Sequence, residues 1–481
     1  MRPWLRRCLL TVSVFALSWT GAIAYWRDST RMPTPGELAG AMLALPLALL
    51  LLLWLGKKLL ARLLAGPALA AAPALAATPQ AEAAAAPAAA APLHIVAATL
   101  RMPGGATAPD LLAAMRSRQV RPALDDQLLD ENGYPLLCGK VDGIDEEVQQ
   151  QLLADWLRAH PQEGLASAPF PFNPEDLRAL ALGAEVLAEL LDEAIQHALS
   201  LAAAVTPAKA LPMLQLHLLM PASWNAAQRQ AGDAWVRHLA REQGWPAEKM
   251  SVPTPAADTA SQPATFALLN QLAGLALPPQ PACLAIVLAC DSHLGELRVH
   301  TLASQGMLFS ASQANGQIPG EGAAGLLLAS PGETAPQDEP APILLHRAAT
   351  GELPQGAGQR GQANTSMLAD LGRQALAAAG GDAAAGIALV SADTDQRTSS
   401  VLELMQCTGA LLPQLDLGEQ VLGLGAACGH CGAVTTLAAL ALARQAAADD
   451  GAPVLCLSNL DPLQRGALVI GPPAENSHGT T

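Results

Sequence analysis

From Leu93 onward, short apolar runs alternate with longer amphipathic stretches. The short runs are rich in leucine and β-branched residues, as buried strands are, and the longer stretches repeat apolar residues at helical spacing. We predict strands at Leu93–Thr99, Met213–Leu219, Leu284–Ala289, Ala323–Ala329, Ile343–Leu345, Gly386–Val390, Val421–Ala426, Val454–Leu457 and Ala467–Ile470. We predict helices at Ala108–Ser117, Glu146–Ala159, Pro174–Ala203, Ala226–Glu242, Thr265–Leu275, Ser366–Ala379, Ser399–Leu411 and Gly432–Ala448. This alternation predicts an α/β body with helices on both faces of a mainly parallel sheet.

The first 65 residues have a different pattern, with two uncharged apolar runs of 19 residues each, at Cys8–Trp26 and Leu38–Gly56. Each run is close to the length of about 20 residues that a helix needs to cross a bilayer. Tryptophans lie near the ends of the runs, where amphipathic rings favour the membrane interface. We therefore predict a membrane anchor at residues 1–65, with transmembrane helices at about 8–26 and 38–56.

The orientation of this anchor follows from its basic residues. Lys57, Lys58 and Arg62 come directly after the second run, and the positive-inside rule places them in the cytoplasm. The first run can also be read as a signal peptide with a cleavage site after Ala24. We favour a retained helix because a second span follows at once, and either reading places the body in the cytoplasm of a bacterial inner-membrane protein.

Residues 66–92 are almost entirely alanine and proline. Repeated proline prevents a long helix, and the segment has nothing from which to build a core. We read it as a semi-extended tether that holds the body near the membrane.

Charge is divided unevenly along the chain. Residues 1–65 hold eight basic and two acidic residues, so the rest of the chain holds 19 basic and 40 acidic residues, a balance of −21. A body this acidic argues against binding to nucleic acid, because such binding depends on neutralising phosphates. The sequence has no phosphate-binding loop of the G-x-x-x-x-G-K type, and we expect neither a cofactor nor a metal.

Five local signatures, in order along the chain, resemble the β-ketoacyl synthase branch of the thiolase-like proteins. They are the first strand from Leu93 with its Pro103-Gly104-Gly105 turn, the Val120 to Val141 region, the Gly320-Glu321-Gly322-Ala323 segment, the Gly429-His430 segment before an Ala/Leu helix, and the ending at Ser458-Asn459 with its last strand. The resemblance implies a layered α/β fold built from a duplicated βαβαβαββ unit. We expect halves at residues 93–335 and 340–475 with five central strands each.

The resemblance also implies where an active site would lie. Ketosynthases use a cysteine nucleophile, two histidines and a lysine. The matching positions here hold Ser261, Asp393, His430 and Gly425, so only His430 keeps its residue. Serine is a weak nucleophile without a base, and an aspartate would repel an enolate. We therefore expect these positions to be vestigial and condensation to be absent.

An alternative stays open at this point. If the fold brings the three segments together, then Ser261, His430 and Asp393 would form a nucleophile, base and orienter, and the chain would be a membrane-associated acyltransferase or hydrolase.

The tetrapeptide Cys428-Gly429-His430-Cys431 has the spacing of a disulfide-exchange motif or half a zinc site. The usual tryptophan before the first cysteine is replaced by Ala427, and no second Cys/His pair lies at a useful spacing. We favour two buried structural thiols that flank a retained histidine. His293 and His300 are read as surface or satisfied core residues.

The whole arrangement resembles a bacterial group: membrane-anchored adaptors that hand a lipase effector to the spike of the type VI secretion system. The resemblance implies a non-catalytic scaffold whose partners are a lipase effector and a spike protein. Thiolase-like proteins usually dimerise through a central strand, so a homodimer is also open, as is a heterodimer with an intact synthase.

Overall fold

The computed structural model describes the body of the chain in nine stretches: residues 92–130, 133–160, 172–205, 211–253, 262–275, 283–330, 341–353, 365–380 and 383–473. The predicted membrane spans, the Ala/Pro tether and Ser261 lie outside these stretches. Among the helices within them, none combines the length and apolar character that a bilayer crossing requires.

Within these stretches, one continuous sheet contains two sets of five strands. The first set runs in the spatial order β1-β7-β6-β4-β5. Strand β7 is antiparallel to both β1 and β6, while β4 is parallel to β6 and to β5. The strands are β1 (Leu93–Arg101), β4 (Met213–Leu219), β5 (Met250–Ser251), β6 (Cys283–Ser292) and β7 (Glu321–Ala329).

The second set has the same plan, in the order β8-β13-β12-β10-β11. Its last strand in sequence, β13, is antiparallel to β8 and β12, and β10 is parallel to β12 and β11. A short antiparallel pairing of β1 with β8 joins the two sets. The strands are β8 (Leu344–Leu345), β9 (Ala349–Glu352), which pairs with β13, β10 (Leu389–Ala392), β11 (Val421–Gly423), β12 (Val454–Ser458) and β13 (Gln464–Gly471). Strand order and direction therefore repeat between the sets.

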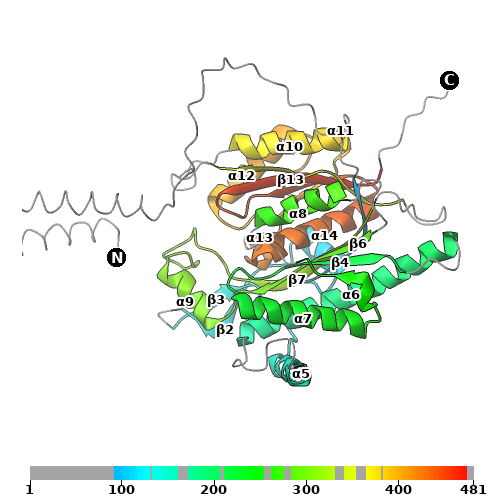
Figure 1. Ribbon diagram of the computed structural model, residues 1–481. Coiled ribbons are helices and arrows are strands. Elements are labelled where there is room, and N and C mark those ends of the chain that lie inside the picture. Colours follow the sequence, from blue (N-terminus) through cyan, green and yellow to red (C-terminus); the bar gives the residue numbers. More distant parts are fainter. Residues whose placement is uncertain are drawn as a thin grey trace, which may run out of the picture. The chain divides into compact units, whose positions relative to one another are not determined.

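Helices lie outside each set of strands and also between them (Figure 1). Helix α6 (Pro174–Val205) packs on β1, β6 and β7, with α5 (Glu146–Ala159) and α7 (Ala226–Glu242) against it. Helix α10 (Thr365–Ala379) packs on β13, with α11 (Ala383–Gly386) and α12 (Thr398–Leu411) beside it. Between the sets lie α8 (Gln262–Leu275) and α14 (Gly432–Asp450), and α14 contacts strands of both sets.

The central position of α14 explains its composition. A helix that is apolar on every side has to be buried on every side. From Ala433 to Ala443 each residue of α14 is buried, including Thr435 and Thr436. All nine residues of β7 are buried as well, which accounts for its unbroken run of small and aliphatic side chains.

Several elements are absent from our sequence prediction. Hairpin strands β2 (Ala123–Leu129) and β3 (Pro135–Cys138) form a separate two-stranded sheet, and α9 (Glu296–Ser304) lies close to it. Helix α4 (Ala108–Arg116), by contrast, lies where we predicted a helix. The predicted strand Val421–Ala426 is wrong beyond Gly423, because the chain turns there into the short helix α13 (Leu424–Cys428).

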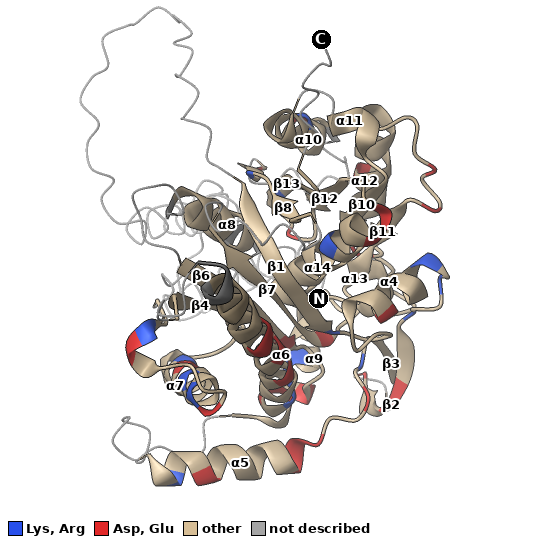
Figure 2. Ribbon diagram, turned by 90° about the vertical axis from the view of Figure 1, so that its right-hand side faces the viewer, with Lys and Arg blue, Asp and Glu red and all other residues tan. Residues whose placement is uncertain are grey.

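Acidic positions recur along α6 and at the start of α5 (Figure 2). Asp145 caps α5 by accepting a hydrogen bond from the Val148 amide at 3.0 Å. The helix predicted at Glu146–Ala159 is therefore confirmed, and its first turn carries Glu146 and Glu147 at the end of the helix dipole that favours acidic residues. Within the part of the chain that the structure describes, no group of three or more His, Cys, Asp or Glu side chains is arranged to hold a metal.

Candidate functional site

Segments from both sets of strands meet where α14 begins. The backbone amide of His430 donates to the carbonyl of Ile318 at 2.7 Å, and the amide of Gly320 donates back to the carbonyl of His430 at 3.0 Å. The thiol of Cys431 donates to the carbonyl of Asp291, which lies in β6. The sequence signatures around Gly320 and His430, which are 110 positions apart, therefore lie side by side.

Asp393 follows β10 and is completely buried. Its carboxylate accepts hydrogen bonds from the hydroxyls of Thr436 (2.8 Å) and Ser458 (2.5 Å) and from the backbone amides of Asn459 (2.9 Å) and Leu460 (3.2 Å). Burial raises the pKa of the Asp393 carboxyl, although these hydrogen bonds act in the opposite direction. The side chain joins β10, β12 and α14, and its contacts are those of a structural residue.

A second layer of buried polar groups surrounds this carboxylate. Asn459 donates to Glu403 at 3.2 Å, and Glu403 accepts from Arg465 at 2.8 Å. Asp395 accepts from Arg397 at 2.5 Å. Because each charge in this layer has a partner of opposite sign, burying the groups is tolerable.

Gly425, which the resemblance matches to the ketosynthase lysine, lies inside α13. A Cβ atom placed on Gly425 would lie 2.6 Å from the carbonyl oxygen of Asp393 and 3.1 Å from that of Thr394. The backbone after β10 therefore occupies the space where a lysine side chain would begin. Glycine is required here for packing, and a cation cannot be presented from this position.

His430 lies beside His293, which our sequence analysis did not place in the site. The two ring centroids are 5.4 Å apart, and the rings are inclined by 35°. His293 is buried, and its Nε2 lies 3.2 Å from Oδ2 of Asp291. Burial lowers the pKa of His430 well below its usual value, and the neighbouring His293, Arg397 and Arg298 lower it further.

These contacts fix the tautomer of His430. Its Nδ1 accepts a hydrogen bond from the amide of Gly432 at 3.2 Å. A neutral imidazole that accepts at Nδ1 carries its proton on Nε2. His430 therefore offers an Nε2–H donor, and its lowered pKa makes it a poor carrier of positive charge near neutral pH.

The proposed triad is incomplete within the described contacts. We find no hydrogen bond between Asp393 and His430 in the resolved stretches, and Nδ1 of His430 is occupied by Gly432. An orienting carboxylate would have to bond that nitrogen. Ser261, the nucleophile of the alternative, lies outside the described residues.

Cys428 and Cys431 are both fully buried and form no disulfide. The Cys428 thiol donates to the carbonyl of Pro103 at 3.4 Å, and the Cys431 thiol to that of Asp291 at 3.1 Å. Burial raises the pKa of Cys428 to about 12 and that of Cys431 well above its usual value. A redox motif needs an accessible thiol of lowered pKa, so this geometry favours the structural reading.

The sequence contained a signal for His293 that we did not use. Asp291 and His293 end a fully apolar run, and polar residues at a strand end meet those of neighbouring strands at the same edge of a sheet. His300, on α9, is exposed.

No protein-family model matches this sequence, and no curated protein sequence matches it. Solved ketosynthase structures resemble it. The ketosynthase from module 6 of the bacillaene synthase of Bacillus subtilis 168 matches with a TM-score of 0.52 and 12% identity, over 79% of this chain and 72% of that chain. The oxazolomycin ketosynthase domain of Streptomyces albus JA3453 matches with a TM-score of 0.51 and 13% identity, over 79% and 75%. The body is therefore a layered α/β fold of the ketosynthase kind.

Proposed function

We propose that this chain is a non-condensing, ketosynthase-like scaffold that binds a protein partner. The observation that carries the proposal is the buried Asp393 carboxylate, which stands at the position of a ketosynthase histidine and has all its described contacts with structural donors. A ketosynthase needs a donor there to stabilise the developing enolate. Asp393 instead holds strands together.

The neighbouring positions support the same proposal. Gly425 leaves no room for a side chain, so the lysine function has no substitute at that position. His430 keeps a donor at Nε2, but the sequence has serine at the matched nucleophile position 261 and aspartate at the matched histidine position 393, and one matched donor does not form a condensing site. A fold can keep its framework after losing its chemistry, and the framework then serves as a binding surface.

We further propose that the scaffold acts at the bacterial inner membrane as an adaptor for type VI secretion. The support is the resemblance of the whole arrangement, with its two predicted spans, its Ala/Pro tether and its acidic body, to the lipase adaptors of that system. The partners would be a lipase effector and the secretion spike protein. The tether would let the body reach a partner while staying close to the secretion machinery.

The test is capture of partners by the full-length chain, cross-linked in cells and purified in detergent. We expect a lipase or a spike protein to be enriched over a mock purification. Recovery of an acyl carrier protein without an effector would overturn the adaptor proposal, and recovery of an intact ketosynthase would indicate a heterodimer instead.

A parallel measurement addresses chemistry. The purified chain is incubated with a radiolabelled acyl-CoA, and acyl transfer to protein and hydrolysis are followed, with Ser261→Ala as the matched control. We expect no difference between the two proteins. Labelling that disappears in Ser261→Ala would contradict the non-catalytic proposal and favour the acyltransferase or hydrolase alternative.

A further inference from the structure

Helix α9 and the β2–β3 hairpin form a small satellite unit with its own apolar core. This core is separate from those under the main sheet, and it links the hairpin to the helix. Its members are Leu128, Leu136, Cys138, Leu294, Val299, Leu302 and Leu308. The hairpin pairs with no strand of the main sheet in the described stretches, so the satellite unit is an addition to the two five-strand sets.

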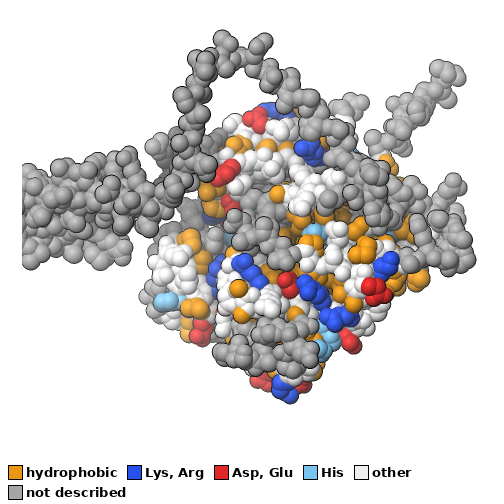
Figure 3. Space-filling view, in the orientation of Figure 1, with side chains coloured by type: hydrophobic (Ala, Val, Ile, Leu, Met, Phe, Trp, Pro, Cys, Tyr) orange, Lys and Arg blue, Asp and Glu red, His pale blue; other side chains and the backbone are white. Residues whose placement is uncertain are grey.

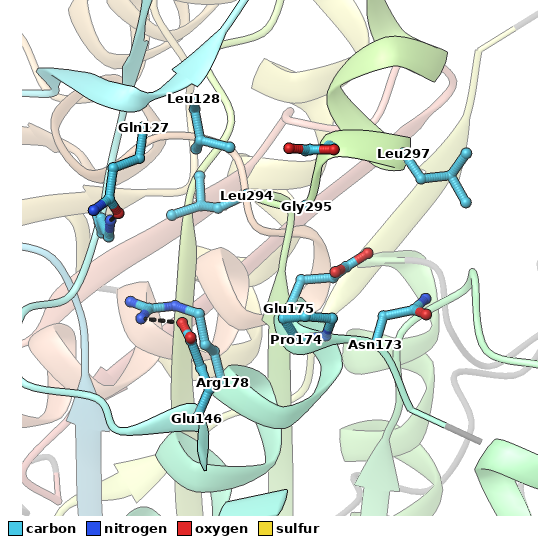
Figure 4. A pocket seen from close by; sticks show the side chains of 12 residues that line it. Gln127, Leu128, Glu146, Asn173, Pro174, Glu175, Arg178, Leu294, Gly295 and Leu297 are labelled. Atoms are coloured by element: carbon cyan, nitrogen blue, oxygen red, sulfur yellow. Dashed lines mark hydrogen bonds and ion pairs between the residues drawn. The ribbon is translucent and has the colours of Figure 1, made fainter. Parts of the chain in front are cut away.

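Two adjoining cavities run along this unit. One, of about 430 Å³, lies between the hairpin, the start of α6 and the start of α9, and the other, of about 510 Å³, continues along α9. Both are lined by Gln127, Leu128, Glu296 and Leu297, so they form one open groove, which we call the α9 groove. Figure 4 shows Leu128 and Leu294 near one another and Arg178 joined to Glu146 lower in the view.

Large apolar side chains at the groove and on the hairpin are exposed. Leu297 is 69% exposed and Leu129 is 51% exposed, and both line the groove. Leu124 and Tyr134 on the hairpin side and Met307 just after α9 are also exposed. In the space-filling view, hydrophobic and acidic side chains lie close together at the end of the body formed by α9 (Figure 3). Clustered exposure of this kind marks interaction sites more often than scattered single leucines do.

The uncompensated charge of the groove is negative. Its two cations are already paired, Arg178 with Glu321 and Glu146, and Lys140 with Asp125. Glu175 and Glu296 form no ion pair within the described residues. Glu175 packs on the backbone of Gly295, where an added Cβ would lie 2.2 Å from its carboxyl carbon. Burial raises the pKa of Glu175, and the nearby carboxylates of Asp176 and Glu296 raise it further.

We propose that the α9 groove binds a polypeptide segment of the partner protein that presents apolar side chains flanked by lysine or arginine. This inference rests on the proposed scaffold function and names the chemistry that the scaffold recognises. Apolar residues of the segment would cover Leu128, Leu129 and Leu297, and its cations would compensate Glu175 and Glu296. An anionic lipid surface would be repelled by the same carboxylates, and a second copy of this acidic body would carry like charge.

The experiment measures binding of a fluorescent Leu/Lys amphipathic peptide to the full-length chain by anisotropy, with a Leu/Glu peptide of equal length as the control probe. Leu297→Ser removes an apolar contact, and Glu296→Gln removes a charge. The matched controls are Leu402→Ser, at an exposed leucine of α12, and Glu419→Gln, at an exposed glutamate. All four positions are exposed, so the variants should fold, which circular dichroism checks.

We expect the Leu/Lys peptide to bind at least tenfold more tightly than the Leu/Glu peptide. Leu297→Ser should weaken binding about tenfold, and Glu296→Gln should weaken it severalfold and reduce its salt dependence. The control variants should bind like the parent chain. The proposal would be overturned if Leu297→Ser and Leu402→Ser lost peptide affinity equally, or if both peptides bound the parent chain equally tightly.

Other occupants give different results. If Leu297→Ser abolishes self-association in sedimentation without affecting the peptide, the groove is a contact between copies and the proposal fails. It also fails if the variant loses binding to phosphatidylglycerol vesicles and not to the peptide. If Leu297→Ser captures a partner from cells as well as the parent chain does, the scaffold function is supported and the proposal that the α9 groove binds the partner is wrong. If the peptide results hold but no partner is captured, the peptide-binding chemistry of the α9 groove is supported and the proposed scaffold function is wrong.

Discussion

At the scale of single residues, Asp393 shows why a sequence match does not reveal a role. The resemblance matches its position after a buried strand to a ketosynthase histidine, and that match stays a prediction. Its contacts come from Thr436 on α14, from Ser458 at the end of β12 and from Asn459 directly after it, and no local pattern links these segments. The same residue type could have oriented His430, and only the long-range contacts separate the two readings.

Gly425, at the position that the resemblance matches to the ketosynthase lysine, allows a direct test of how tightly the backbone packs there. Gly425→Ala should lower the free energy of unfolding by about 1–3 kcal/mol, because its Cβ would lie 2.6 Å from the carbonyl oxygen of Asp393. The matched control is Gly274→Ala in α8, where an added Cβ meets nothing within 4 Å. Urea unfolding followed by circular dichroism measures both. Equal stability of the two variants would show that the segment yields easily and that Gly425 is not required.

The buried thiols of Cys428 and Cys431 make a second prediction at this scale. Neither should react with iodoacetamide in the native chain, because both are fully buried and burial raises the pKa of Cys428 to about 12. Both should react after unfolding in urea. Peptide mass mapping gives the modified fraction, with the partly exposed Cys283 as the internal reference. Faster labelling of Cys428 than of Cys283 would revive the redox reading.

At the scale of elements, buried strands and long helices were predictable, and polar elements were not. Helical periodicity identified α6, whose apolar residues share one face. Helix α14 has no polar face, and its long run of alanine and leucine identified it instead. Strand β2 was missed because it carries Asp125 and Asp126 and most of its residues are exposed. For the site, the resemblance named Gly320 and His430 as members of two separate signatures, and it did not predict that they touch. The contact depends on how the two strand sets meet, and the His293 neighbour depends on where β6 ends.

The ion pair of Glu321 and Arg178 tests how elements are held together. Glu321 on β7 is fully buried and accepts from Arg178 of α6, from Ser292 at 3.0 Å and from the Val141 amide at 2.9 Å. Glu321→Ala should cost about 3–5 kcal/mol, because it removes the buried partner of the guanidinium, which is then paired only with the part-exposed Glu146. Asp370→Ala, at an exposed pair with Arg373, should cost less than about 1 kcal/mol. If urea unfolding gave the two variants a comparable loss of unfolding free energy, the stabilising role assigned to the buried pair would be contradicted.

At the scale of the whole molecule, the α/β class followed from alternation alone, and the repeated order of the two strand sets did not. The predicted mainly parallel sheet is wrong, because β7 and β13 run antiparallel to both of their neighbours in the main order and make the sheet mixed. Neighbours such as β1 and β7 are separated by more than 200 residues, so their pairing has no local signature. The strong negative charge of the body was visible in the sequence. The sequence does not show that the α9 groove is negatively charged. That conclusion needs the structure, in which Arg178 and Lys140 are already paired while Glu175 and Glu296 are not.

Buried histidines make the stability of the body depend on pH in a predictable direction. Burial lowers the pKa of His217 to about 4, and burial with His197 and Arg444 lowers that of His94 to about 4. Unfolded histidine titrates near pH 6.5, so between pH 6.5 and 4 the unfolded chain binds more protons than the folded chain. The free energy of unfolding should therefore fall as the pH falls through this window.

Carboxyls whose pKa burial raises, such as Asp393 and Asp176, act in the opposite direction at the acidic end, so the variant must isolate the histidine contribution. His217→Gln should reduce the pH slope of the unfolding free energy by up to about one proton, and His94→Gln/His217→Gln by up to about two. Urea unfolding at half-unit steps from pH 7.5 to 4 gives these slopes, with the plateau above pH 7 as the internal reference. Because glutamine cannot take up a proton at either site, parallel curves for parent and variants would mean that these imidazoles titrate alike in the folded and unfolded chain.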